Sequence, residues 1–360
     1  MSKKKSYIIN IIFMLVLIIV VLYVLLRGKD VDSILAALKN ADKKYILICV
    51  AFIIGQFMLQ SLSIYILFRV FGYRVPYLEN FRSTLVGYFY NSITPSAGGG
   101  QPMQVFYFRD YDVPIGASGV ALLLWTTIYK VALLVIQVVL LIFKRDFIFS
   151  SLGAYSWMYF LGMGVNIFNT VLYSVVVFWP TSVRSIVDLV MKLVKKLRFI
   201  KHQDKIRAKI ESVLDNYAEC SKYISRDSKY MLIILLITII QRCIFFLIGW
   251  GSIRALGYTN VSVIDAFILQ SLVSVCIDIM PVPGGAGMNE SFNVKMFGRY
   301  IGAEGSLSAM LINRGVTFYI MLIICAGVAI YVHMRHTRKS AEKAELKRKR
   351  KEAKKKGKSS

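Results

Sequence analysis

Two short segments rich in proline and glycine interrupt long apolar stretches of the chain, and they restrict its possible folds more than any other feature. The second Pro/Gly segment, residues 280–290, reads MPVPGGAGMNE. Prolines remove backbone donors and glycines remove side chains, so in contact with lipid this backbone would leave polar groups unsatisfied at several kcal/mol each. We therefore expect the segment to lie inside protein or beside a watery cavity. An ordinary surface loop is the competing interpretation.

The first Pro/Gly segment, residues 91–104, has the same chemistry and reads NSITPSAGGGQPMQ. Each segment belongs to a longer pattern that opens with Gly-Tyr, at Gly72 and at Gly257. A predicted apolar helix follows (77–93 or 263–279), then the Pro/Gly segment, a short helix and one long apolar span. The pattern predicts a tandem structural repeat.

The composition and the distribution of charge are typical of a membrane protein. Of the 360 residues, 56% are hydrophobic and only 18% are charged, yet the formal net charge is +25. Positive residues gather at 3–5, in the segment 180–229 and in the tail from Arg335, which predicts a cytoplasmic location for all three. We expect the basic loop and tail to meet anionic lipid headgroups, rather than a specific nucleic acid.

The predicted fold class is all-α: a polytopic integral membrane protein with about six spans and two re-entrant hairpins tipped by the Pro/Gly segments. Eight full spans is the alternative. A short amphipathic helix is predicted at 31–38. The expected spans are 7–26, 45–71, 115–143, 155–179, 230–252 and 306–333. The inner hairpin's second arm, 102–110, is about 14 Å of helix and too short to cross.

The two hairpins are expected to enter from opposite faces, which makes the two copies an inverted repeat. This arrangement places the transport site of many secondary transporters near the midplane, although a channel or a structural scaffold could share it. The expected divisions are 1–44 (first span and interfacial helix), 45–143 (repeat 1), 144–229 (connecting span and basic amphipathic segment), 230–333 (repeat 2) and 334–360 (basic tail). We expect a multi-pass protein of the cell membrane with both termini in the cytoplasm.

Ionisable residues within apolar sequence are the sharpest single-residue signals for a substrate site, because each is costly unless paired or hydrated. They are Lys130, Arg242, Asp278, Glu290 and Arg314. Under one hypothesis the cations bind a phosphate while the carboxylates balance charge or relay protons. Under the other they form buried structural ion pairs. The anion hypothesis for Lys130 and Arg314 requires that neither Asp278 nor Glu290 is their partner.

The Pro/Gly segments add polar groups next to exposed helix ends, where an anion is favoured. Candidate substrate-binding residues are Ser96, Gln101, Gln104 and Asn289, beside Ser92 and Thr94. The predicted hairpin tips are Pro95, Gly98, Gly99, Gly100, Pro281, Pro283, Gly284, Gly285 and Gly287. The five cysteines and three histidines show no metal-ligand spacing, and we expect no metal, no cofactor and no catalytic residue.

The two Pro/Gly segments resemble the signature regions of the lysylphosphatidylglycerol synthase transmembrane-region family, over about residues 7–335. That family includes the flippase part of the multiple peptide resistance factor. Members typically show Gly-Glu-x-x-Arg at the first segment, where this chain has GQPMQ without either charge. The second segment, closed by Glu290, keeps the pattern better.

The resemblance implies a flippase-like translocase for a polar or aminoacylated phospholipid such as lysylphosphatidylglycerol. The alternative is phosphatidylglycerol lysyltransferase, which uses lysyl-tRNA and is linked to resistance against cationic antimicrobial peptides, or a membrane subunit working with a separate synthase. In full-length synthases a large soluble domain performs the transfer, and we expect this chain to lack that domain, so that it is not an enzyme by itself. A passive membrane scaffold is the third class.

Overall fold

The computed structural model describes residues 31–94, 98–179, 211, 215, 217–220, 228–278, 285 and 287–356. Within them, all regular secondary structure is helical. Two predicted elements fall outside this part of the chain: the first span at 7–26 and most of the basic segment 180–229. So do the predicted site and tip residues Pro95, Ser96, Pro281, Pro283 and Gly284.

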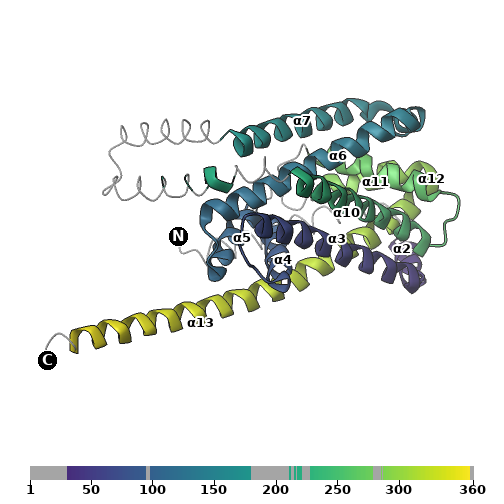
Figure 1. The fold of residues 1–360 in the computed structure, drawn as a ribbon. Helices are drawn as coiled ribbons and strands as arrows, with labels where there is room; N and C mark the ends of the chain where they lie inside the picture. The colour runs from purple at the N-terminus through teal and green to yellow at the C-terminus, as the bar shows by residue number, and fades with distance from the viewer. Residues whose placement is uncertain are drawn as a thin grey trace, which may run out of the picture.

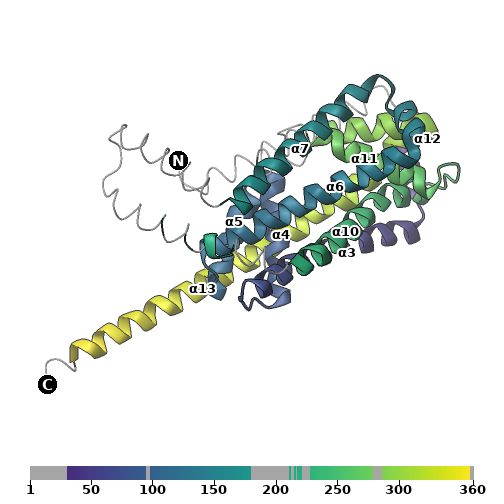
Figure 2. The same ribbon diagram turned by 45° about the horizontal axis from the view of Figure 1, so that its top comes forward.

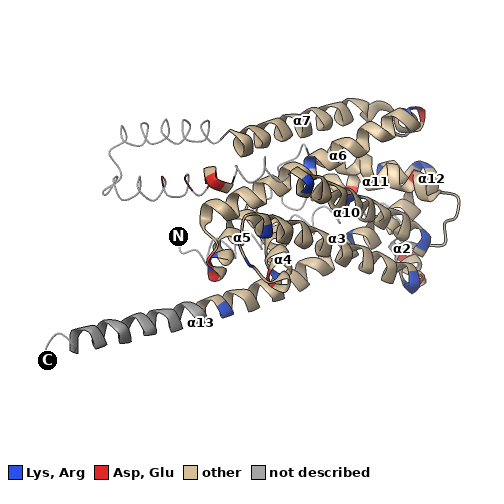
Figure 3. Cartoon of the chain, in the orientation of Figure 1, with Lys and Arg blue, Asp and Glu red and all other residues tan. Residues whose placement is uncertain are grey.

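Four stretches of the described chain are long and apolar enough to cross a membrane. They are Lys43–Val70, Ile115–Phe178, Ser228–Ala255 and Met288–Arg338. The second contains two helices, α6 (Ile115–Leu152) and α7 (Ser156–Phe178), joined by a 3-10 turn. Charged residues lie mainly toward the two ends of the bundle, with few along its length (Figure 3). The protein is thus an all-α, multi-pass membrane protein, and its number of spans stays a prediction.

Helices α3 (Lys43–Val70) and α10 (Ser228–Ala255), the first helix of each copy, pack side by side in opposite directions (Figure 1). Three hydrogen bonds set this register. The Asp42 N–H donates to the carbonyl of Ala255, the Cys49 thiol to the carbonyl of Ile248, and the Gln241 amide to Gln56. Successive hydrogen bonds are seven residues apart on both helices, and the residue numbers rise along α3 while they fall along α10. Opposed first helices are what an inverted repeat requires.

Glycines with the same left-handed conformation end both of these helices. Gly72 follows α3 and Gly257 follows α10, each with φ of +82°. A side chain is penalised in this conformation, and glycine adopts it readily, as is common just after a helix. The Gly-Tyr pairs on which the predicted repeat rests are therefore helix-ending signals at matching points.

Each copy continues with a hairpin of helices. In the first copy, α4 (Tyr77–Ile93) and α5 (Gly100–Phe108) form it, followed by a 3-10 turn, Arg109–Tyr111. In the second, α11 (Val263–Ile277) precedes α12 (Met288–Arg314). The nine residues of α5 give about 14 Å of helix, well short of the hydrocarbon thickness. How these hairpins sit in a bilayer stays a prediction.

Two irregularities shape the last part of the chain. Gly302 has φ 74° and ψ 172° inside α12, so a short helix precedes it and the last apolar stretch follows it. A π-helical turn, Gly315–Ile320, then separates α12 from α13 (Met321–Lys356). Helix α13 extends well beyond the bundle in both views (Figures 1 and 2). At the opposite end of the chain, the predicted helix at 31–38 is α2 (Val31–Lys39).

Helix α13 is fastened to the first hairpin where it leaves the bundle. Arg335 Nη1 lies 2.5 Å from Glu79 Oε1, and His336 Nδ1 lies 2.8 Å from the carboxylate of Asp110. The Tyr107 hydroxyl and His333 Nδ1 are 3.2 Å apart. Burial alone would raise the pKa of the Glu79 carboxyl, but hydrogen bonds from Tyr111 and Arg335 and the nearby arginine charges lower it overall.

Candidate functional site

A cavity of about 760 Å³ lies within the bundle and is lined by helices of both predicted copies. Its lining comes from α3, α4, α5 and α6 of the first copy, α7, and α10, α11, α12 and the π turn of the second. Gly98 of the first Pro/Gly segment and Gly285 of the second both reach it. Segments nearly two hundred residues apart therefore meet at one chamber, which we call the central cavity.

Lys130 and Asp278 form an ion pair across the central cavity wall. Lys130 Nζ on α6 lies 2.7 Å from Asp278 Oδ2, at the C-cap of α11. Their side chains are 14% and 29% exposed, so water screens the pair in part. The contact joins α6 to the end of α11, just before the second Pro/Gly segment.

Arg314 and Glu290 form a second pair that is almost fully buried. Arg314 Nε lies 2.8 Å from Glu290 Oε1, and the side chains are 4% and 1% exposed. The other carboxylate oxygen, Oε2, accepts the N–H of Gly287 at 2.6 Å. The guanidinium also stacks 4.2 Å from the ring centre of Phe318. Glu290 thus ties the second Pro/Gly segment to the far end of α12.

These two pairs contradict the premise on which Lys130 and Arg314 were expected to form an anion site. That hypothesis required both cations to lack an acidic partner, and each has one. The contacts are those of the alternative, structural ion pairs. A direct role of either cation in substrate binding stays a prediction.

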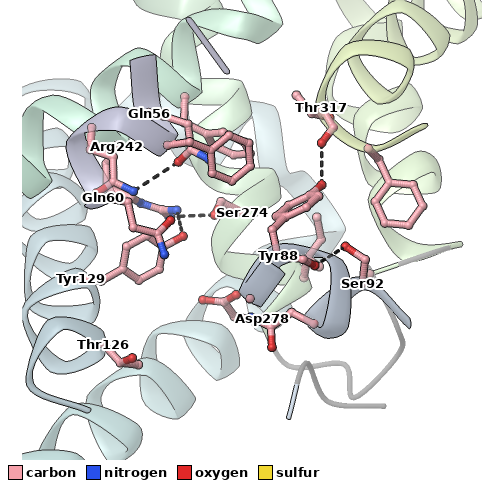
Figure 4. A pocket seen from close by; sticks show the side chains of 18 of the residues that line it. Gln56, Gln60, Tyr88, Ser92, Thr126, Tyr129, Arg242, Ser274, Asp278 and Thr317 are labelled. Carbon is pink, nitrogen blue, oxygen red and sulfur yellow. Dashed lines mark hydrogen bonds between the residues drawn. The ribbon is translucent and has the colours of Figure 1, made fainter. Parts of the chain in front are cut away.

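Arg242, at the middle of α10, is the cation with a different environment. It is 3% exposed, and no carboxylate of the described residues lies within ion-pair distance of it. Its guanidinium donates to the hydroxyl of Tyr129 and, at 2.9 Å, to that of Ser274 (Figure 4). It also stacks 4.5 Å from the ring centre of Tyr129 and 4.7 Å from that of Phe246. Its Nε is buried without a hydrogen-bond partner.

Amide side chains are the most frequent polar groups of the central cavity. Ten of them line it: Gln56, Gln60, Asn91, Gln101, Gln104, Asn169, Gln241, Gln270, Asn289 and Asn313. Gln101, Gln104 and Asn289 were predicted because they lie in the Pro/Gly segments, whereas most of the others lie outside those segments and carry no charge. Amides within apolar stretches are also costly, and this signal could have revealed Gln56, Gln241 and Asn313.

The structure places the predicted residues Gln101 and Gln104 at different depths. Gln101 Nε2 donates to Thr126 Oγ1 at 2.6 Å, which joins α5 to α6 at the cavity. Gln104 is 4% exposed and donates to the carbonyl of Ser83 at 3.0 Å, so it mainly holds α5 against α4. Asn289 lines the cavity, and its side-chain oxygen accepts from Asn293 at 2.6 Å.

The glycines of the first Pro/Gly segment are needed for close packing. Gly99 N–H donates to Thr94 Oγ1 at 2.9 Å, and Gly100 N–H donates to Asn91 Oδ1 at 2.8 Å. These donors at the start of α5 are therefore used within the segment, which argues against the binding of an anion by them. A Cβ on Gly100 would stand 2.4 Å from the carbonyl oxygen of Gly87. In the second segment, Gly285 has φ +64°, which favours glycine.

Comparisons with known proteins agree with this architecture. The family model described as the lysylphosphatidylglycerol synthase TM region matches residues 11–325. A protein described as a UPF0104 membrane protein from Archaeoglobus fulgidus is 26% identical over 283 residues, which covers 74% of this chain and 80% of that protein. The match includes both Pro/Gly segments and every helix that lines the central cavity. The chain therefore belongs to the lysylphosphatidylglycerol synthase transmembrane-region family, whose members are membrane proteins of lipid metabolism or translocation.

Proposed function

We propose that this protein is a translocase that moves a polar or aminoacylated phospholipid between the two leaflets of the cell membrane. The observation that carries the proposal is the central cavity, which both copies build and both Pro/Gly segments reach. Its volume of about 760 Å³ lies in the usual range for small-molecule sites. A polar headgroup would occupy the cavity while the acyl chains stay in lipid.

The antiparallel packing of α3 and α10 supports an alternating-access mechanism. In an inverted repeat, each hairpin closes the shared cavity from one side, and access alternates as the copies rock against each other. The two Pro/Gly segments would then be the two gates. Both termini would lie in the cytoplasm, as the basic residues near each end favour.

Leaflet exchange in liposomes tests the proposal. The full chain would be reconstituted with fluorescent headgroup analogues of phosphatidylglycerol and lysylphosphatidylglycerol, and the label in the outer leaflet would be quenched chemically. We expect exchange to be fast with the protein and slow in empty liposomes. Lysyl-tRNA and phosphatidylglycerol, added to the same sample, test the alternative of a lysyltransferase.

Two glycine variants test the two gates. Gly99→Leu meets Thr94, within 2.6 Å of an added Cβ, and Gly285→Leu is strained by its positive φ. We expect both variants to insert normally and to lose exchange. Gly164→Leu, on an exposed face of α7 with no heavy atom within 4 Å, is the control and should keep it. Full exchange in both gate variants would contradict the two-gate mechanism.

Labelling of single cysteines tests the predicted topology. If the first hairpin is re-entrant, cysteines at Ser96 and Tyr111 should both be reached from the cytoplasmic side by an impermeant maleimide. Labelling from opposite sides would instead favour eight full spans.

A further inference from the structure

Resting on the proposed translocase function, the geometry points to one class of headgroup: a phosphodiester that carries a single negative charge and whose remainder is uncharged and rich in hydroxyls. We infer that Arg242 binds its phosphate. Four sets of contacts lead to this inference: the pairing of the acids, the environment of Arg242, the unused polar atoms beside it, and the amide lining.

The charge of the central cavity favours one anion. Lys130, Arg242 and Arg314 contribute three positive charges at its lining, against the lining carboxylate of Asp278 and the buried carboxylate of Glu290, which pairs with Arg314. Both carboxylates are already engaged, Asp278 with Lys130 and Glu290 with Arg314 and the N–H of Gly287. One positive charge remains, on Arg242. An anion of charge −1 neutralises the site, whereas an added ammonium group finds no uncommitted carboxylate in the described lining.

Arg242 has the position and the shape to bind a phosphate. It is about halfway along the 28 residues of α10, a span that is apolar on both sides of it. The hydroxyls of Tyr129 and Ser274 accept hydrogen bonds from the two terminal nitrogens of Arg242, and these bonds fix the orientation of its guanidinium group (Figure 4). A planar guanidinium suits the oxygens of a phosphate, which it binds through two parallel hydrogen bonds.

Two unpartnered donors belong to residues that contact the same tyrosine. Besides Arg242 Nε, the indole N–H of Trp125 is buried without a hydrogen-bond partner. Both residues contact Tyr129: the rings of Trp125 and Tyr129 are 5.3 Å apart, and the guanidinium is 4.5 Å from the Tyr129 ring centre. Buried donors are costly when unpaired. An anion oxygen accepts such hydrogen bonds, and a cation cannot.

The amide lining suits hydroxyl groups. An amide both donates and accepts, as does a hydroxyl, whereas an ammonium group only donates. Gln60 and Asn169 line the cavity with no hydrogen-bond partner among the described residues, and the buried Gln241 Oε1 is an unused acceptor. These groups can bind the hydroxyls of a glycerol or other polyol headgroup next to the phosphate.

The inference therefore ranks lipids by charge. Phosphatidylglycerol carries −1 and two hydroxyls, so it should bind most tightly. Zwitterionic phosphatidylethanolamine should bind less well. Lysylphosphatidylglycerol places two ammonium groups in a cavity whose carboxylates are engaged, so we expect its affinity to be lower than that of phosphatidylglycerol by about 10-fold or more.

Equilibrium binding measures this ranking without any transport step. The purified full chain in neutral detergent would be titrated with short-chain forms of the three lipids, following Trp fluorescence and thermal stabilisation. Glycerol phosphate and inorganic phosphate form a soluble arm, which should bind far more weakly than the lipid. Equal binding of the soluble anions would identify a site for free phosphate and overturn the lipid assignment.

Substitutions at Arg242 test its assigned role. Arg242→Gln should reduce the affinity for phosphatidylglycerol about 10-fold and reduce the difference in affinity between phosphatidylglycerol and lysylphosphatidylglycerol. Arg242→Lys keeps the charge but not the planar guanidinium, so its loss of affinity should be smaller. Arg254→Gln is the matched control, on the same helix but stacked on Trp250 and bonded to the carbonyl of Tyr258. It should bind as the wild type does.

Three results would overturn the inference: lysylphosphatidylglycerol binding as tightly as phosphatidylglycerol, a folded Arg242→Gln variant with wild-type affinity, or Arg242→Lys with unchanged affinity. If Arg242→Gln does not fold, the inference is tested by the order of lipid affinities in the wild-type protein and by the affinity of Arg242→Lys. Leaflet exchange separates this inference from the function on which it rests. If the protein exchanges lipids but shows no preference for phosphatidylglycerol, only the headgroup assignment is rejected. If it prefers phosphatidylglycerol in binding but does not exchange lipids, only the translocase function is rejected.

Discussion

The two Pro/Gly segments occupy equivalent places in the two copies but are held by different chemistry. Neutral side chains hold the first: Asn91 and Thr94 accept the N–H groups of Gly100 and Gly99. A buried carboxylate, Glu290, holds the second through Arg314 and the N–H of Gly287. The comparison teaches that the order of helices around each Pro/Gly segment is repeated. The means of satisfying its polar groups has diverged, and so have the expected energies.

Removing the charge of Glu290 should have the largest effect on stability. Glu290→Gln removes the carboxylate that pairs with the buried Arg314, which should lower the free energy of unfolding by about 3 kcal/mol or more. Thermal melting in detergent and unfolding in dodecyl sulfate would measure the loss. The double change Glu290→Leu with Arg314→Met removes both charges and should recover most of it. If the Glu290→Gln variant melted at the same temperature as the wild type, the buried ion pair would not be what stabilises the second segment.

Adding a methyl group to Gly100 should cost the next largest amount. A Cβ there lies 2.4 Å from backbone and side-chain oxygens, which have little room to move, so Gly100→Ala should destabilise by about 1–3 kcal/mol. In the second segment, Gly285→Ala meets its positive φ and one side-chain methyl, of Ile277, 2.9 Å from the added Cβ, and should cost about 1 kcal/mol. Gly164→Ala is the open-space control. The same melting assay compares the three variants. Equal losses of stability in Gly100→Ala and Gly285→Ala would show that the first segment is not the more closely packed of the two.

Loss of the neutral cap in the first segment should be smaller. Asn91→Leu leaves the Gly100 N–H without its acceptor, at about 1–2 kcal/mol. Asn169→Leu changes another cavity amide, one that has no partner in the described chain, and should be milder. If Asn169→Leu proved the more damaging in melting experiments, capping by Asn91 would not be what holds this segment.

The partly exposed pair should matter least for stability. Lys130 and Asp278 retain water contact, so a double-mutant cycle of Lys130→Gln and Asp278→Asn should give a coupling of about 1 kcal/mol or less. Both single variants and the double variant would be melted together. A coupling as large as that between Arg314 and Glu290 would show that solvent does not screen this pair.

The sequence was sufficient for most of the helices that the structure describes and for the two breaks between them, because both follow from local rules. The predicted helix at 77–93 is α4, and the predicted 263–279 differs from α11 only at its end. The apolar lengths and the Pro/Gly chemistry determine these boundaries. By contrast, the kink at Gly302 and the π turn at Gly315–Ile320 depend on packing between helices, which no local pattern specifies.

The candidate site was predictable in composition but not in pairing. Five ionisable residues were selected because charge in apolar sequence is costly, and four of them prove to be two ion pairs. Which acid meets which base depends on distances between helices far apart in sequence, such as α6 and α11. The isolation of Arg242, and its hydroxyl partners Tyr129 and Ser274, likewise exist only in the folded bundle.

Helix α13 is attached to α4 at two separated points. Beside the cavity, the Tyr88 hydroxyl donates to the carbonyl of Thr317, in the π turn from which α13 starts, at 2.6 Å. Farther along, Arg335 reaches Glu79, at the opposite end of α4. Because these two contacts link α13 to the same hairpin, a tilt of its protruding end would move the hairpin as long as both contacts hold. Under the proposed two-gate mechanism, force applied to the basic tail would therefore reach the first Pro/Gly segment, at the far end of α4.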